Sequence, residues 1–124
     1  MDNVITESMA KAEENLTAAE LCLEYDLRNA SVNRAYYAMF QAAIAVLTKF
    51  GISRRGERWE HGYVQAQFSN ALIQRRKVLP GRFKKALPDI MAHRHEADYS
   101  ATQISSKIAN LTLRLAQSFV QQIQ

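Results

Sequence analysis

The chain has 124 residues, of which 48% are hydrophobic and 23% are charged, a composition typical of a globular domain. No apolar run approaches the roughly 18 residues that a transmembrane helix needs, and the N-terminal stretch lacks the basic and apolar regions of a signal peptide. The single cysteine, Cys22, has no partner for an internal disulfide. We therefore expect one helical domain, residues 1–124, in the cytoplasm and without membrane contact.

Charge is distributed unevenly along the chain. Residues 1–28 hold seven acidic and two basic side chains, a balance of −5, whereas residues 49–94 hold eleven basic and three acidic ones, a balance of +8. A basic segment of this kind attracts a polyanion such as RNA. Its alternative role is to face solvent or the acidic first helix of the same or a second subunit.

Apolar residues recur at helical spacing through most of the chain, and glycine and proline are scarce. The pattern predicts an all-α, up-and-down bundle of four to five helices. A first helix is expected over Asn3–Asp26 and a second over Ser31–Phe50. Ser31 should be the N-cap of the second helix, and Gly51 should end it by adopting the left-handed conformation.

The second half of the chain predicts shorter helices. Ile52–Arg58 is expected to be a basic loop, and Trp59–Gln74 a third helix. A fourth helix should begin near Pro80, with a kink or a restart at Pro88, because proline lacks the backbone N–H that a helix interior uses.

The last helix has a start signal and an apolar face. Ser100 and Gln103 have the spacing of a capping box, which predicts that the helix begins there. Its apolar residues recur three or four positions apart and are expected to be buried. These residues are Ile104, Ile108, Leu111, Leu115, Phe119 and Ile123.

The most informative stretch is Ser31–Gln41, which reads SVNRAYYAMFQ. Arg34 and Gln41 are close to two helical turns apart and therefore share a helix face, with Tyr37 between them. This stripe of guanidinium, phenol and carboxamide can recognise a ligand. The opposite face is apolar and is predicted to be core: Tyr36, Phe40, Ala43, Ile44, Leu47 and Phe50.

Several other kinds of site are excluded by their missing motifs. The chain contains no Gly-rich phosphate loop, no paired-cysteine metal pattern and no HExxH motif. His93 and His95 are two residues apart and point in different directions on a helix. We therefore expect no metal site and no cofactor.

Two segments resemble the HEPN superfamily: NRAYYAMFQAAIAVL at residues 33–47, and RHEADY at Arg94–Tyr99. The likeness is to small stand-alone HEPN proteins in which RAYYAxFHAA precedes RxEADY, and it covers roughly Asn3–Val120. It implies a four-to-five-helix bundle that usually dimerises. Many such proteins are metal-independent endoribonucleases of toxin–antitoxin or defence systems. Others are non-catalytic partners of small nucleotidyltransferases.

The resemblance assigns roles to two residues of the stripe. Arg34 matches the motif arginine, which would clamp a scissile phosphate. Relatives commonly have histidine where this chain has Gln41. A carboxamide can orient a phosphate or a water, but it does not exchange protons near neutral pH. The catalytic motif is therefore degraded, and we leave open whether the protein is an enzyme.

Histidines elsewhere offer a replacement for the motif histidine: His61, His93 and His95. His61 either follows Arg54 and Arg55 at motif-like spacing, or reaches the Arg34 stripe from its own helix. The catalytic candidates are thus Arg34, Gln41 and His61.

The expected RNA- or nucleotide-binding residues are basic or aromatic: Arg34, Tyr37, Arg54, Arg55, Arg58 and Arg94. Asp98 is expected to be structural, either as the acidic partner of Arg34 or as a cap of the last helix. Tyr99 is expected to pack against Tyr36 and Tyr37. Trp59 and Tyr63 are either core residues or, beside the basic loop, a platform on which bases stack.

Three functions follow as competing hypotheses. The first is a HEPN-type ribonuclease that cuts RNA around Arg34 at a homodimer interface. The second is a non-catalytic HEPN dimer that binds nucleotide or RNA, or is the partner of a nucleotidyltransferase-type antitoxin. The third is a purely structural helical dimer.

Overall fold

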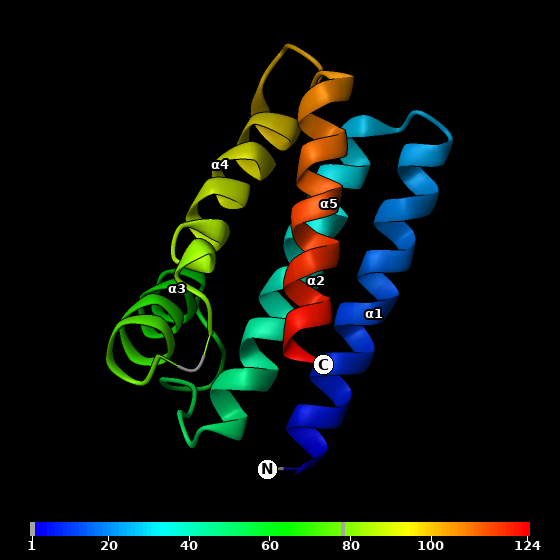
Figure 1. The fold of residues 1–124 in the computed structure, drawn as a ribbon. Coiled ribbons are helices and arrows are strands. Elements are labelled where there is room, and N and C mark those ends of the chain that lie inside the picture. The colour runs from blue at the N-terminus through cyan, green and yellow to red at the C-terminus, as the bar shows by residue number, and fades with distance from the viewer. Residues whose placement is uncertain (1, 78) are drawn as a thin grey trace.

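The computed structural model describes residues 2–77 and 79–124, and within them the fold is all-α, as predicted. The helices are α1 (Asp2–Glu24), α2 (Arg28–Lys49), α3 (His61–Gln67), α4 (Ala86–Tyr99) and α5 (Ser106–Ile123). A π-helical segment, Phe68–Arg75, continues α3, and one 3₁₀ turn, Gly81–Phe83, precedes α4. Figure 1 shows α1 and α4 running in one direction and α2 and α5 in the other, which is the expected up-and-down arrangement.

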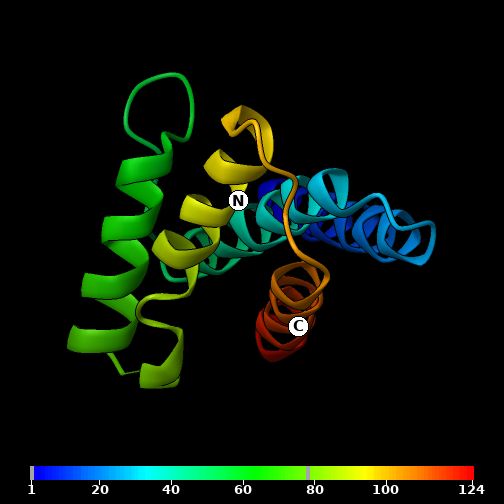
Figure 2. The ribbon, with the colours of Figure 1, turned by 90° about the horizontal axis from the view of Figure 1, so that it is seen from above.

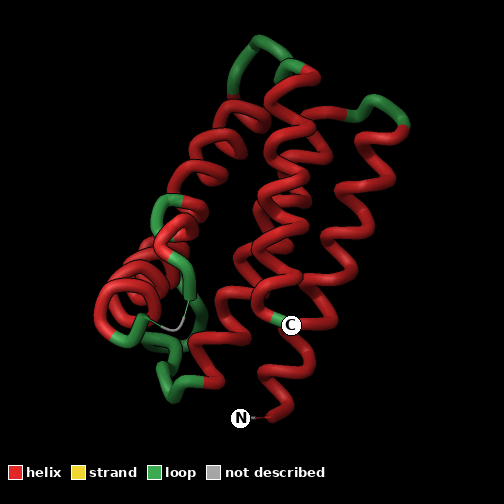
Figure 3. The backbone as a smooth tube through the Cα atoms, viewed as in Figure 1, coloured by secondary structure: helices red, strands yellow, loops and turns green. Residues whose placement is uncertain are grey.

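The long helices form the bundle, and the third helix stands beside it. Seen from above in Figure 2, α3 and its π-helical extension lie at the outer edge, next to α4. The tube in Figure 3 shows loops at the two ends of the bundle and further loop segments beside it, where the chain leads into α4. None of the helices in the described ranges is long and apolar enough to span a membrane.

Helix α2 is the centre of the fold, since it contacts α1, α3, α4 and α5. From Ser31 to Thr48 every residue is buried except four: Asn33, Arg34, Tyr37 and Gln41. These four lie within about 100° of one another around the helix axis, at 100° per residue, and we call them the open strip. The face predicted to be core is buried, apart from the half-buried Phe50, and alanines fill much of the remaining surface. Alanine keeps side-chain bulk low, so neighbouring helices can pack closely on several sides of α2.

The first two helices meet at a tighter turn than the sequence predicted. α1 ends at Glu24, and Asp26 adopts a positive φ of 59°. α2 begins at Arg28, so Ser31 is not its N-cap. Ser31 is instead buried in the first turn, where its hydroxyl donates to the carbonyl of Ala19 at 2.8 Å. Gly51, with φ of 80°, follows the end of α2 as predicted.

The third and fourth helices begin later than predicted. α3 starts at His61 and becomes π-helical at Phe68, so Trp59 precedes the helix. Pro80 is extended and lies before the 3₁₀ turn. Pro88 is the third residue of α4, in the first turn, where a backbone N–H has no intrahelical partner. The predicted restart is therefore correct, and no kink is needed.

The capping-box prediction for the last helix is wrong. α5 begins at Ser106, and the Ser105 hydroxyl accepts the N–H of Ile108 at 3.2 Å. The N–H of Ile104 donates to the Asn29 side chain at 2.9 Å, which ties this segment to α2 and holds it outside the helix. Leu111 was expected in the core, but it is 49% exposed.

Phe119 joins the outer segments to the bundle. Its ring lies 5.0 Å from that of Phe68 in the π-helical segment and 5.3 Å from that of Phe83 in the 3₁₀ turn. All three side chains are at most 2% exposed. Aromatic pairs at these distances add stability beyond their buried area.

We predict that Phe119→Ala lowers the free energy of unfolding by about 3–5 kcal/mol, because it leaves a cavity between three elements. Leu111→Ala on the same helix is the control and should cost under about 1 kcal/mol. Urea denaturation of both variants measures the difference. Equal losses would contradict the burial pattern of α5.

Candidate functional site

Arg34 is fixed on the open strip by neutral acceptors. Its Nε and Nη2 atoms donate to the side-chain oxygen of Asn33, and its Nη1 atom donates to that of Asn15 on α1 at 3.0 Å. These three bonds use three of the five guanidinium N–H groups and leave two for a ligand. Ion pairs in the described ranges join Arg28 to Asp26 and Arg94 to Asp98. Arg34 is therefore oriented without being neutralised.

Asp98 has a different partner from the one predicted. It accepts the Nη1–H of Arg94 at 3.1 Å, one turn earlier on α4, and also the side-chain amide of Asn33 at 3.1 and 3.2 Å. Asn33 thus stands between Asp98 and Arg34, and Ser105 caps α5 in place of Asp98. The result is a network from Asn15 through Arg34 and Asn33 to Asp98, and it links α1, α2 and α4.

Arg94 and Tyr99 also differ from expectation. The Arg94 side chain is 11% exposed and is ion-paired with Asp98. Arg94 is therefore better placed to position its neighbours than to contact RNA directly. Tyr99 does not pack against Tyr36 and Tyr37, because it is 76% exposed and tilted against His95. It ends α4 at the surface.

Two cations flank the Tyr37 ring. The guanidinium carbon of Arg34 lies 5.0 Å from the ring centroid, and that of Arg94 lies 5.7 Å from it. Arg94 is also 5.3 Å from the Tyr36 centroid. Cation–π attraction of this kind holds guanidinium groups at an aromatic face. The middle of the open strip therefore holds two guanidinium groups against one aromatic ring, and Arg94 is the one that is paired with a carboxylate.

His61 reaches this cluster from the start of α3. Its ring stacks on Phe40 with 4.4 Å between centroids and lies edge-on to Tyr37 at 6.1 Å. Its Nδ1 atom is hydrogen-bonded to the hydroxyl of Tyr36. Of the two arginines at motif-like spacing from it, Arg55 turns to the ring of Tyr63, 5.0 Å away.

The protonation states of this pair follow from burial. Burial lowers the pKa of His61 below its ordinary 6.5, and the positive charge of Arg94 and the nearby His95 lower it further. Burial also raises the pKa of Tyr36 to about 12, against the opposing effects of Gln65 and Arg94. At neutral pH the imidazole is therefore uncharged and the phenol protonated. A neutral imidazole can take up a proton, whereas the carboxamide of Gln41 cannot.

Gln41 faces a hollow of about 310 Å³ between α1 and α2, which we call the Gln41 hollow. Trp59 lines it, and also lines a second hollow beyond the end of α2. The basic loop runs along this region, with Arg54 at the second hollow and Arg58 beside His61 in a further one. Arg54, Arg55 and Arg58 are all exposed, so their charges face either solvent or a ligand.

The family follows from comparison with known proteins. The model described as the HEPN domain matches residues 5–124. The chain belongs to the HEPN family. No curated protein sequence matches it.

Sequence reasoning missed three parts of this HEPN site. The contact of Asn33 with Arg34 could have been inferred from the sequence, because Asn33 directly precedes Arg34. Asn15 carries none, since only the packing of α1 on α2 brings it to the guanidinium. The bond between Tyr36 and His61 likewise depends on how α3 lies against α2. In the described ranges of the HEPN chain, no group of three His, Cys, Asp or Glu side chains could hold a metal ion.

We predict that His61 titrates below pH 6.5 in the folded HEPN domain, as followed by NMR. Arg94→Gln should raise this pKa, because it removes a nearby positive charge, whereas Arg114→Gln on the exposed side of α5 should not. Because the unfolded chain binds this proton more tightly, the contribution of His61 to stability should fall as pH drops below about 6.5. A pKa at or above 6.5 in the wild type would refute the assignment.

Proposed function

We propose that this HEPN protein is RNA-directed and binds a phosphate of RNA or of a nucleotide at Arg34. The observation that carries the proposal is the environment of this guanidinium. It is half-buried, held by two amide oxygens, and free of a carboxylate partner among the described residues. A fixed arginine with unused donors suits a phosphate oxygen, since charge-assisted bonds of this type are the strong ones.

The surroundings of Arg34 support a polymer more than a small anion. Tyr37 places an aromatic ring beside the guanidinium, and the Gln41 hollow extends the surface toward the basic loop. The exposed arginines Arg54 and Arg58 then continue the positive charge. A single strand could follow this path with phosphates on arginines and bases on aromatic rings.

Metal-independent RNA cleavage is the second candidate, and His61 is the observation that favours it. Its neutral imidazole, beside Tyr36 and Tyr37, could accept the proton of a 2′-hydroxyl. The 2′-oxygen would then attack the adjacent phosphorus, the bond to the 5′-oxygen would break, and that oxygen would leave with the proton that His61 had taken up. Arg34 would hold the phosphoryl group and Gln41 would only orient it.

HEPN domains commonly dimerise, and we propose a homodimer for this chain. Two copies would bring two Arg34 sites together at one interface. A nucleotidyltransferase-type partner, with this protein as toxin or antitoxin, remains a further prediction of the family membership.

We predict that Asn15→Asp weakens RNA binding about tenfold without lowering stability. The substitution keeps the shape of the side chain but sets a carboxylate against Arg34, which neutralises the charge offered to phosphate. Asn110→Asp on α5 adds the same charge away from the strip and is the control. Arg34→Ala should give at least the same loss. Fluorescence anisotropy with labelled single-stranded RNA measures it, and equal effects of the two Asn→Asp changes would oppose the proposal.

We also predict that the wild type cleaves labelled structured RNA in EDTA and that His61→Gln abolishes cleavage while RNA binding persists. His93→Gln, on α4, is the matched control and should stay active. Cleavage that survives in both Arg34→Ala and His61→Gln would rule out this site. Binding without cleavage between about pH 5 and 9 would leave the protein as a binding module.

A further inference from the structure

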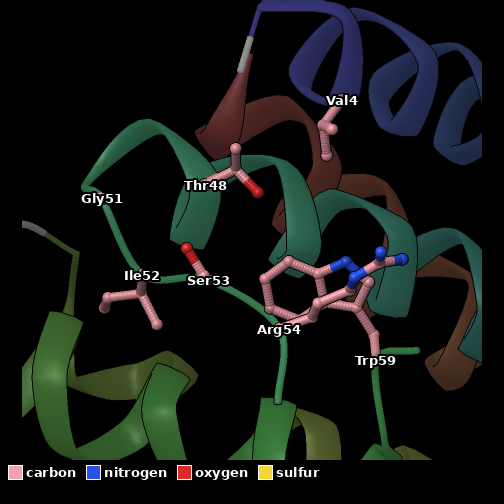
Figure 4. Close-up of a pocket in the computed structure, with 7 residues that line it drawn as sticks. All are labelled: Val4, Thr48, Gly51, Ile52, Ser53, Arg54 and Trp59. Atoms are coloured by element: carbon pink, nitrogen blue, oxygen red, sulfur yellow. The ribbon is translucent and has the colours of Figure 1, made fainter. Parts of the chain in front are cut away.

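The second hollow, which Trp59 and Arg54 line, lies where α2 ends, and Figure 4 shows the residues around it. We call it the Thr48 pocket. It measures about 310 Å³, at the small end of the ~300–1,000 Å³ range of ligand sites. Its lining combines apolar, aromatic, hydroxyl and basic groups and contains no acidic side chain: Val4, Thr48, Gly51, Ile52, Ser53, Arg54 and Trp59.

Thr48 carries a hydroxyl that nothing in the described chain satisfies. The residue is 7% exposed, and its Oγ1 atom has no hydrogen-bond partner. Figure 4 shows this hydroxyl pointing into the pocket, toward Trp59. Buried polar side-chain atoms are nearly always paired, and an exception calls for an explanation such as a missing ligand. A ligand polar group in the pocket would supply the missing bond.

Trp59 supplies the aromatic wall of the pocket. It is half-buried and lies between the Thr48 pocket and the Gln41 hollow, both of which it lines. Arg54 is exposed at the pocket, where its charge is available to an anion. A flat ring with polar edges and an attached phosphate matches these three groups together.

We propose that the Thr48 pocket binds a nucleobase. The base stacks on Trp59, its polar edge bonds to the Thr48 hydroxyl, and its phosphate lies near Arg54. If the base belongs to RNA, this inference rests on the proposed function, because the strand then also contacts Arg34. Thr48 follows Arg34 by fourteen residues, roughly 21 Å along α2, so the strand needs several nucleotides to reach both.

The test compares three probes: a single-stranded RNA, an abasic strand of the same length, and free nucleoside monophosphates. Trp59 is the chain's single tryptophan, so quenching of its fluorescence reports a base beside it, and loss of that quenching in the Thr48 variant assigns the base to the Thr48 pocket. The variant is Thr48→Val, which removes the hydroxyl and keeps the shape. Thr112→Val, at a buried threonine of α5, is the matched control.

We expect RNA to bind about tenfold more tightly than the abasic strand. Thr48→Val should reduce that difference severalfold, because the hydrogen bond is lost while stacking on Trp59 remains. We also expect Thr48→Val to leave the denaturation midpoint unchanged or raised, because the lost hydroxyl has no partner in the free protein. A merely structural threonine would give the opposite pair of results. Thr112→Val should leave the preference for RNA intact.

The other outcomes separate the two proposals. Equal binding of RNA and abasic strand, with both weakened by Arg34→Ala, would overturn the base pocket and leave the phosphate site standing. Quenching by a monophosphate that Thr48→Val abolishes, without RNA binding, would support the pocket for free nucleotide and overturn the RNA proposal. No quenching by any probe would overturn the pocket.

Discussion

The site depends on one constraint, which is the enclosure of α2 by the rest of the fold. Between Ser31 and Thr48, four residues escape burial, and they lie on one side of the helix. A guanidinium there loses part of its water and must find acceptors within the protein. Asn33 supplies one from α2 itself and Asn15 supplies another from α1. Packing of the helices therefore decides where Arg34 points.

The chemistry of these acceptors matters as much as their position. A carboxylate would hold Arg34 equally well but would cancel its charge. The acidic member of the network, Asp98, instead pairs with Arg94 and touches Arg34 only through the amide of Asn33. Arg94 in turn lies over Tyr36, and its positive charge adds to the effect of burial in lowering the pKa of the nearby His61. The network thus separates a structural ion pair from a cation offered to a ligand.

The sequence predicted the parts of this arrangement that depend on one helix. Helical spacing gave the all-α fold and the stripe of Arg34, Tyr37 and Gln41. Two of the three missed parts involve residues from different elements: Arg34 and Asn15 are 19 positions apart, and Tyr36 and His61 are 25 apart. Helix ends were misjudged for the same reason, since tertiary bonds such as that of Ser31 to Ala19 outweigh local capping preferences. Asp98 was assigned to the wrong arginine because Arg94, one turn away on its own helix, competes for it.

In the proposed complex, RNA phosphates lie on the open strip and on the basic loop beside it. The salt dependence of RNA binding tests this most directly, because each phosphate contact on a single strand contributes about 0.7 to the slope of log K against log salt. We predict that Arg34→Ala combined with Arg54→Ala reduces the slope by about 1.4. An unchanged slope in that variant, together with a reduced slope in Arg75→Ala with Arg76→Ala, would place the RNA on the other basic segment and contradict the account.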